Sequence, residues 1–212
     1  MLSLIALVPL NEMDDNSIEF FDESIQFRAD SELVNSRLTG IGSINYSMDS
    51  HEPNGITHPE YLAQIDQFAQ WLRQQPRVAH VTSFSDVIKR LNRNLHGDDD
   101  RYYSVPEDPK LAAQILLLYE LSLPLGLDVA NQVSTDKSAS RMVVSIYKSS
   151  AKEVIELDNQ AMAWMKENTP KLLTEGASSN IMFAHITERN IKSLIYGLAV
   201  GLVVISFIIL LA

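Results

Sequence analysis

The segment His96-Gly97-Asp98-Asp99-Asp100 holds the residues of this sequence that come nearest to a metal site. Three carboxylates suit a hard cation such as Ca²⁺, and a histidine beside an aspartate suits a transition metal. A closed site needs ligands that converge from several directions, which neighbouring residues of one loop rarely provide. The segment also lacks the spaced acids and the terminal glutamate of an EF-hand. We therefore interpret it as an Asp-rich turn after a helix that ends at Leu95, and keep a metal-dependent hydrolase as an alternative.

Other catalytic patterns are missing from the sequence. It contains no G-x-S-x-G, H-E-x-x-H, Walker A or Rossmann glycine motif, and the spacing of its serines and histidines nominates no triad. His80 lies in a predicted strand and His185 lies beside an apolar run, so we interpret both as packed or interfacial residues. The sequence therefore predicts a protein that is not an enzyme and that has no catalytic residue, cofactor or metal ligand.

The composition narrows the class of protein further. The chain has 212 residues, of which 46% are hydrophobic and 21% charged, so it is not collagen-like, low in complexity or wholly disordered. Its net charge of −10 argues against a nucleic-acid partner. Because it has no cysteine, disulfides, thiolate nucleophiles, zinc–thiolate sites and Fe–S clusters are excluded.

The stretch from Leu194 to Ala212 reads LIYGLAVGLVVISFIILLA and contains no charge, Pro, Asn or Gln. As a helix it is about 28 Å long, close to the ~30 Å hydrocarbon core of a bilayer. The alternative is a buried helix of a soluble protein, but such a helix keeps a polar stripe, whereas this one is apolar on every side. We predict a transmembrane helix over residues 191–212, with Ser193, Gly197 and Gly201 as a small-residue face for packing against other helices.

The two ends of the sequence suggest a larger protein. Arg189, Lys192 and Tyr196 anchor the start of the predicted span, but the apolar run continues to the last residue, so we expect a truncated span. We treat residues 1–42 as an N-terminal connecting segment whose apolar beginning, Met1–Leu10, is a first strand or the end of a truncated earlier span. Its acid-rich part, Asn11–Glu32, is a solvated connection or a cation-binding lip.

Residues 43–190 predict an extracytoplasmic α+β domain built from two β-α-β units. In the first unit, a strand over Ser43–Met48 precedes a helix that a Thr57–Glu60 capping box opens and that ends at Gln75, and Val78–Val81 forms the next strand. Two such units favour a split β-α-β (ferredoxin-like) sandwich.

The second unit begins with a strand over Met142–Tyr147. A Ser150–Glu153 capping box then opens a helix that ends near Asn168, and a short segment around Asn180–Ala184 leads into the span.

A mostly helical insertion, residues 84–131, separates the two units. In its first helix Val87, Ile88 and Leu91 form an apolar face, and we place Lys89 and its basic neighbours outside. The run Leu111–Leu123 is almost continuously apolar and must bury against the sheet, a neighbouring domain or the membrane surface. We therefore predict that it is a contact surface.

Four segments resemble one protein family. They are PEYLAQIDQFAQWLRQQPRVAHVTSFSDVIKRLNRNLHGDD (Pro59–Asp99), LAAQILLLYELSLPLGLD (Leu111–Asp128), DKSASRMVVSIY (Asp136–Tyr147) and IMFAHITERNIKSL (Ile181–Leu194). In this order they resemble the first extracytoplasmic loop of RND-superfamily exporters of the MMPL type. FFDESIQFR (Phe20–Arg28) is similar to the segment that follows the first transmembrane helix of that family.

The resemblance implies a porter subdomain followed by the start of transmembrane helix two, in the bacterial inner membrane, with residues 11–190 on the periplasmic side. Such exporters use the proton-motive force to move hydrophobic or amphiphilic molecules, and this chain would work with the remaining transmembrane helices and a second porter subdomain. The family's proton-relay acids lie in later spans, so no coupling residue is carried over and the substrate stays open.

Two functional hypotheses follow. In the first, substrate passes along apolar surfaces of the porter subdomain, and the residues expected to line or gate the route are Leu116, Leu117, Leu118, Tyr119 and Leu123. In the second, the chain is complete, and a tail-anchored membrane protein presents a protein-interaction module through its Leu111–Leu123 face.

Overall fold

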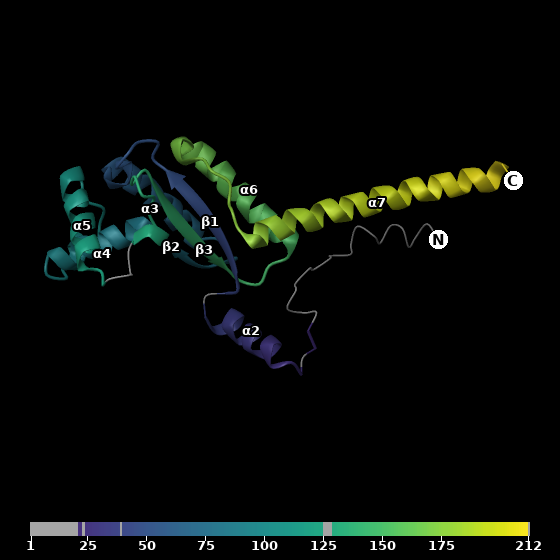
Figure 1. Ribbon diagram of the computed structural model, residues 1–212, viewed down its shortest axis with the longest axis horizontal. Helices are drawn as coiled ribbons and strands as arrows, with labels where there is room; N and C mark the ends of the chain where they lie inside the picture. The colour runs from purple at the N-terminus through teal and green to yellow at the C-terminus, as the bar shows by residue number, and fades with distance from the viewer. Residues whose placement is uncertain (1–20, 23, 39, 125–128, 212) are drawn as a thin grey trace.

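The computed structural model describes residues 21–22, 24–38, 40–124 and 129–211. The predictions for Met1–Leu10, and for the part of the acid-rich segment before residue 21, lie outside the described residues. The described chain is a mixed α+β fold with a small antiparallel sheet and an apolar C-terminal helix, which confirms the predicted class at this level (Figure 1).

The sheet has three strands, β1 (Gly42–Asp49), β2 (Val78–Thr82) and β3 (Ala139–Ile146), in the order β1-β3-β2. Both outer strands pair antiparallel with β3, so the last strand in sequence is the central one. Along β1 the side chains alternate, and Ile44, Tyr46 and Met48 are fully buried on one face. All three predicted strands are confirmed.

Helices α3 (Pro59–Arg73) and α6 (Ala151–Asn168) cover this buried face of the sheet. Phe68 of α3 contacts the ring of Tyr46 edge-on at 5.4 Å between centroids. Trp164 of α6 stacks on Phe68 at 5.6 Å and on Trp71 at 5.5 Å. The aromatic cluster therefore joins both helices to the sheet. The predicted apolar face of α3 is buried: Leu62, Ile65, Phe68 and Leu72.

Of the two capping boxes that the sequence predicts, the structure forms one and not the other. At α6 the Ser150 side chain accepts from the Glu153 backbone and the Glu153 carboxylate accepts from the Ser150 backbone, so this box is confirmed. The box over Thr57–Glu60 is wrong. Thr57 ends a short 3₁₀ turn, Gly55–Thr57, and its hydroxyl donates back to the Asn54 carbonyl at 3.1 Å, so it does not cap α3.

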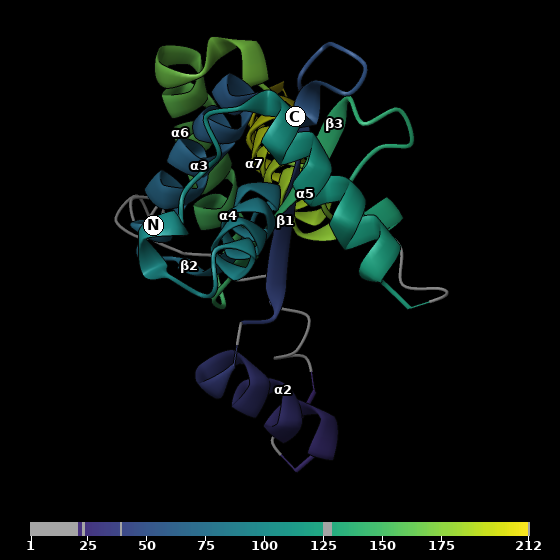
Figure 2. The same ribbon diagram turned by 90° about the vertical axis from the view of Figure 1, so that its left-hand side faces the viewer.

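The insertion contains α4 (Phe84–Leu95), a 3₁₀ turn (Asp100–Tyr102) and α5 (Pro109–Ser122), which confirms that it is mostly helical. In Figure 1 these helices lie at one end of the molecule and the C-terminus lies at the other. Figure 2, viewed along the long axis from that end, places α4 and α5 in front and the C-terminal helix behind.

Within the predicted connecting segment the chain forms an additional helix, α2 (Gln26–Arg37), none of whose residues is buried. The Lys148 backbone N–H donates to the Asn35 side chain at 2.9 Å, which ties α2 to the end of β3.

The C-terminal helix, α7 (Ser179–Leu211), is 33 residues long and begins twelve residues before the start predicted at 191. The segment around Asn180–Ala184 is therefore the first turns of this helix rather than a separate connection. Ile181 and Ala184 are buried where these turns pack on α6 and β1. Just before the helix, Ala177 makes an isolated antiparallel bridge with Asn45 of β1. Beyond these turns α7 extends away from the domain as a single rod (Figure 1).

Candidate membrane helix and contact surfaces

Within the described residues, α7 is the one helix long and apolar enough to cross a membrane. None of its most apolar window is buried in the structure, so it is not a core helix of this fold. An added Cβ at Gly197 or Gly201 would meet nothing within 4 Å, and Ser193 is exposed. The small-residue face predicted for helix packing is therefore uncovered.

The charged residues of α7 lie in the turns before the apolar run. The Lys192 ammonium donates to the Glu188 carboxylate at 2.7 Å, and His185 Nδ1 lies 3.9 Å from the other Glu188 oxygen. These contacts compensate the negative charge of Glu188 within the helix. The nineteen residues from Leu194 onward contain no charged side chain.

The apolar run in α5 divides into a buried and an exposed side. Ala112, Ile115 and Leu116 pack into the core. Leu116 is only 2% exposed, because it lies on the same side of the helix as Ala112 and Ile115. The exposed side carries Leu117 at 53%, Leu118 at 52% and Leu121 at 75% exposure, with Tyr119 and Leu123 half-buried.

The Asp-rich turn is a set of local ion pairs. The His96 ring stacks on Tyr102 at 3.7 Å, and its Nδ1 lies 2.8 Å from the Asn92 carbonyl oxygen. Arg93 pairs with Asp100 at 3.2 Å. Arg101 pairs with Asp99 at 2.6 Å, and this guanidinium lowers the pKa of the Asp99 carboxyl.

Over the described ranges, no three His, Asp or Glu side chains gather where they could hold a metal ion. The acids of the turn face arginines, so the geometry offers no support to the hydrolase alternative.

A buried ion network joins α4 to α3. The Lys89 ammonium lies 2.5 Å from Asp66 Oδ1 and 3.2 Å from Asp86 Oδ1, and Arg73 also pairs with Asp86. Lys89 is 7% exposed, so its predicted outward position is wrong. Burial lowers the pKa of Lys89, but the hydrogen bond and charge of Asp66 outweigh it, and the pKa of Lys89 is raised.

A second buried polar contact lies under α6. The Tyr46 hydroxyl donates to Asp158 Oδ1 at 3.0 Å, and the Gly176 backbone N–H donates to the same oxygen at 3.0 Å. Burial raises the pKa of the Asp158 carboxyl, and these two hydrogen bonds only partly offset it. Asp158 therefore connects the sheet, α6 and the segment that leads into α7.

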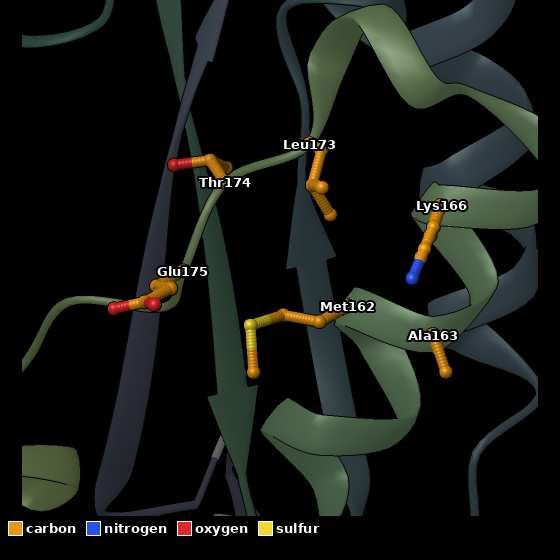
Figure 3. A pocket seen from close by; sticks show the side chains of 6 residues that line it. All are labelled: Met162, Ala163, Lys166, Leu173, Thr174 and Glu175. Atoms are coloured by element: carbon orange, nitrogen blue, oxygen red, sulfur yellow. The ribbon is translucent and has the colours of Figure 1, made fainter.

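An open hollow of about 510 Å³ lies between α6 and the residues that follow it. Its lining residues are Met162, Ala163, Lys166, Leu173, Thr174 and Glu175. Figure 3 shows the Leu173 side chain directed into the space beside α6, whereas the Thr174 hydroxyl and the Glu175 carboxylate point away from that helix. No nucleophile with an adjacent base lies among the lining residues, so the hollow suggests no reaction.

The two buried polar contacts were not predicted from the sequence. One signal could have indicated Asp158, because it interrupts the apolar face that Val154, Leu157 and Ala161 form on α6. The Lys89–Asp66 pair has no such local signal, since its residues are on different helices.

The comparisons with known proteins identify no family for this chain. No protein-family model, curated protein or solved structure matches this chain. The structure itself defines the class as a small α+β domain that continues into one helix able to cross a membrane.

Proposed function

We propose that this chain forms the periplasmic porter subdomain and membrane anchor of a proton-driven exporter of hydrophobic or amphiphilic molecules in the bacterial inner membrane. The observation that carries the proposal is the continuation of the α+β domain into α7, whose apolar window is entirely unburied. A helix of that kind is stable in lipid, because its side chains need no water and its backbone hydrogen bonds are internal.

The order of the strands supports a split β-α-β (ferredoxin-like) arrangement for the porter subdomain. β1 and β2 belong to one β-α-β unit, and β3 of the second unit lies between them. Helices α3 and α6 pack on one face, and Ala177 bridges the free edge of β1, where the fourth strand of such a sandwich would pair.

The exposed leucines of α5 support a contact surface on the aqueous side of the membrane. In the views of Figures 1 and 2, α5 lies at the end of the domain opposite the tip of α7. If α7 crosses the bilayer, Leu117, Leu118 and Leu121 face the aqueous side. We assign this surface to the substrate route or to the second porter subdomain, and α7 packs against the remaining transmembrane helices.

The alternative function is a tail-anchored interaction module, and the same exposed leucines favour it. The two functions differ in the location of the domain, which is periplasmic in the first and cytosolic in the second.

A single introduced cysteine separates them. The chain has no cysteine, so Gln67→Cys on the exposed side of α3 provides one reactive thiol. The exporter predicts that a membrane-impermeant maleimide labels intact cells as completely as permeabilised cells. Labelling that requires permeabilisation of the inner membrane overturns the periplasmic assignment and supports the module.

Export is measured in cells that produce the chain within its full genomic reading frame. We expect a fluorescent amphiphile to be extruded, and a protonophore to stop the extrusion. Leu117→Arg, in the exposed α5 surface, is expected to slow extrusion, whereas Arg90→Met on the exposed side of α4 is the matched control. Extrusion that persists with the protonophore contradicts the proposed mechanism.

A further inference from the structure

The Asp158 carboxyl lies where the body of the domain meets the residues that lead into α7. The residue is 5% exposed. The Tyr46 hydroxyl of β1 and the Gly176 backbone N–H both donate to its Oδ1, each at 3.0 Å. One oxygen of α6 therefore holds both a strand of the sheet and residues 173–177, which we call the junction segment.

The junction segment has few other backbone contacts. Ala177 forms the isolated bridge with β1, and Gly176 donates to Asp158. Thr174 and Glu175 form no backbone hydrogen bond with any described residue. Over the part of the segment that precedes the bridge, the contact with Asp158 is therefore what ties the backbone to α6.

Tight packing at Gly176 carries this contact to α7. A Cβ added at Gly176 would lie 2.5 Å from Asp158 Oδ1, 2.7 Å from the Ile181 side chain and 2.7 Å from Ile44 of β1. Ile181 and Ala184 are the buried residues of α7. A displacement of Gly176 therefore acts directly on the turns that attach α7 to the domain.

Three neighbouring elements present titratable groups to Asp158. Burial raises the pKa of its carboxyl most strongly, and the hydrogen bond from Tyr46 of β1 lowers it. Glu175 of the junction segment raises this pKa, and His185 of α7 lowers it when the ring is protonated. His185 Nδ1 also lies 3.9 Å from a Glu188 oxygen, so its charge is shared between two carboxylates.

The two protonation states of Asp158 differ in how well they fit this site. A protonated carboxyl still offers an acceptor oxygen to Tyr46 and Gly176, so both hydrogen bonds remain. An ionised carboxyl places a charge between two neutral donors, and a buried charge without a close cationic partner is costly.

Water lies close to the carboxyl on one side. The open hollow of about 510 Å³ is lined by Met162 of α6 and by Leu173, Thr174 and Glu175 of the junction segment (Figure 3). Met162 follows Asp158 by four residues, which is about one helical turn. Movement of the junction segment away from α6 would open the carboxyl to this water.

We propose that Asp158 is a pH switch at the base of α7. Its protonated carboxyl holds the junction segment and the first turns of α7 against β1 and α6. Its ionised carboxylate lets the junction segment move away from α6, so that water from the hollow solvates the charge and the domain can turn relative to its helix. The proposal does not depend on export.

The raised pKa gives the direction of the switch. In the open form the carboxyl is in water and titrates near its ordinary value of 3.8, whereas in the closed form its pKa is higher. The closed form is therefore most stable below 3.8 and loses stability as the pH rises through its own pKa. Between the two values, each pH unit raises the ratio of open to closed molecules about tenfold.

Amide hydrogen exchange of the full chain in detergent micelles, resolved by residue and corrected for the intrinsic rate at each pH, tests the switch. We expect Gly176 and Ala177 to exchange through an opening that leaves Val144, in the central strand, protected. Their protection should fall about tenfold per pH unit above 3.8 and then become constant.

Three variants assign this profile to one carboxyl. Asp158→Asn should make the protection of the junction segment independent of pH, and Glu156→Gln, exposed on the same helix, is the matched control that should follow the parent. Glu175→Gln, at an exposed position, removes a like charge and should bring the constant level to a lower pH, which tests the switch even if Asp158→Asn does not fold.

Two results would overturn the proposal. If Gly176 and Ala177 exchange only together with Val144, the junction does not open locally. If their protection in the parent is constant with pH, or changes equally in Asp158→Asn, the Asp158 carboxyl does not control the opening.

Discussion

The substitution Lys89→Met removes the central charge of the network between α3 and α4. Methionine keeps most of the apolar stem and volume of lysine, so the change creates little cavity. It leaves Asp86 paired with Arg73, but Asp66 keeps only uncharged donors, the Ser85 hydroxyl at 3.1 Å and the Gln70 amide at 2.8 Å. The destabilisation therefore comes mainly from an uncompensated carboxylate at Asp66.

The size of the effect follows from the burial of the partners. Breaking a fully buried ion pair costs about 3–5 kcal/mol, whereas exposed pairs contribute about 0–1 kcal/mol. The side chains of Asp66 and Asp86 are 15% and 17% exposed, so water still reaches both carboxylates. We expect Lys89→Met to lower the free energy of unfolding by about 2–3 kcal/mol at neutral pH.

Tryptophan fluorescence is a suitable assay for this loss. The two tryptophans of the sequence, Trp71 and Trp164, stack at 5.5 Å between α3 and α6, so urea unfolding of the detergent-solubilised chain changes their emission. Arg90→Met, on the exposed side of α4, removes the same charge and should change stability by less than about 0.5 kcal/mol.

A double substitution tests the cause. Asp66→Asn in the Lys89→Met background removes the uncompensated charge and should recover about 1 kcal/mol. If Lys89→Met and Arg90→Met unfold at the same urea concentration, the network does not stabilise the fold, and the argument from burial is wrong.

Two further predictions concern Asp158. Gly176→Ala should cost about 1–3 kcal/mol in urea unfolding, because the new Cβ would lie 2.5 Å from Asp158 Oδ1 and 2.7 Å from Ile44; unchanged stability would contradict the close packing. Burial raises the folded pKa of Asp158 above 3.8, so its ionisation removes stability as the pH rises from that value. Asp158→Asn keeps an acceptor oxygen but cannot ionise, so its stability relative to the parent should increase as the pH rises from 3.8. A difference in unfolding free energy between variant and parent that stays constant with pH would refute this.

Local patterns in the sequence were sufficient for most helices and strands. The alternation in β1, the capping box at Ser150 and the charge-free run after Lys192 all depend on neighbours within a few residues. The long start of α7 and the helix α2 were not predicted, because polar residues interrupt the apolar pattern in the first and no residue is buried in the second.

The candidate surfaces were predicted only in part. The sequence identified the apolar run of α5 but not which leucines it buries, since Leu116 and Leu117 differ only in the face that meets the core. The small-residue face of Ser193, Gly197 and Gly201 on α7 follows from sequence spacing, but its exposure depends on which side of the helix the domain holds.

The sequence by itself determined that this chain has an α+β body and a helix suited to a bilayer, because periodicity and the absence of charge are local properties. Only the tertiary structure placed β3 between β1 and β2, buried Lys89 against Asp66 and joined Tyr46 to Asp158. Each of these contacts connects residues far apart in the chain, and the free energy that selects them arises only when distant elements pack together.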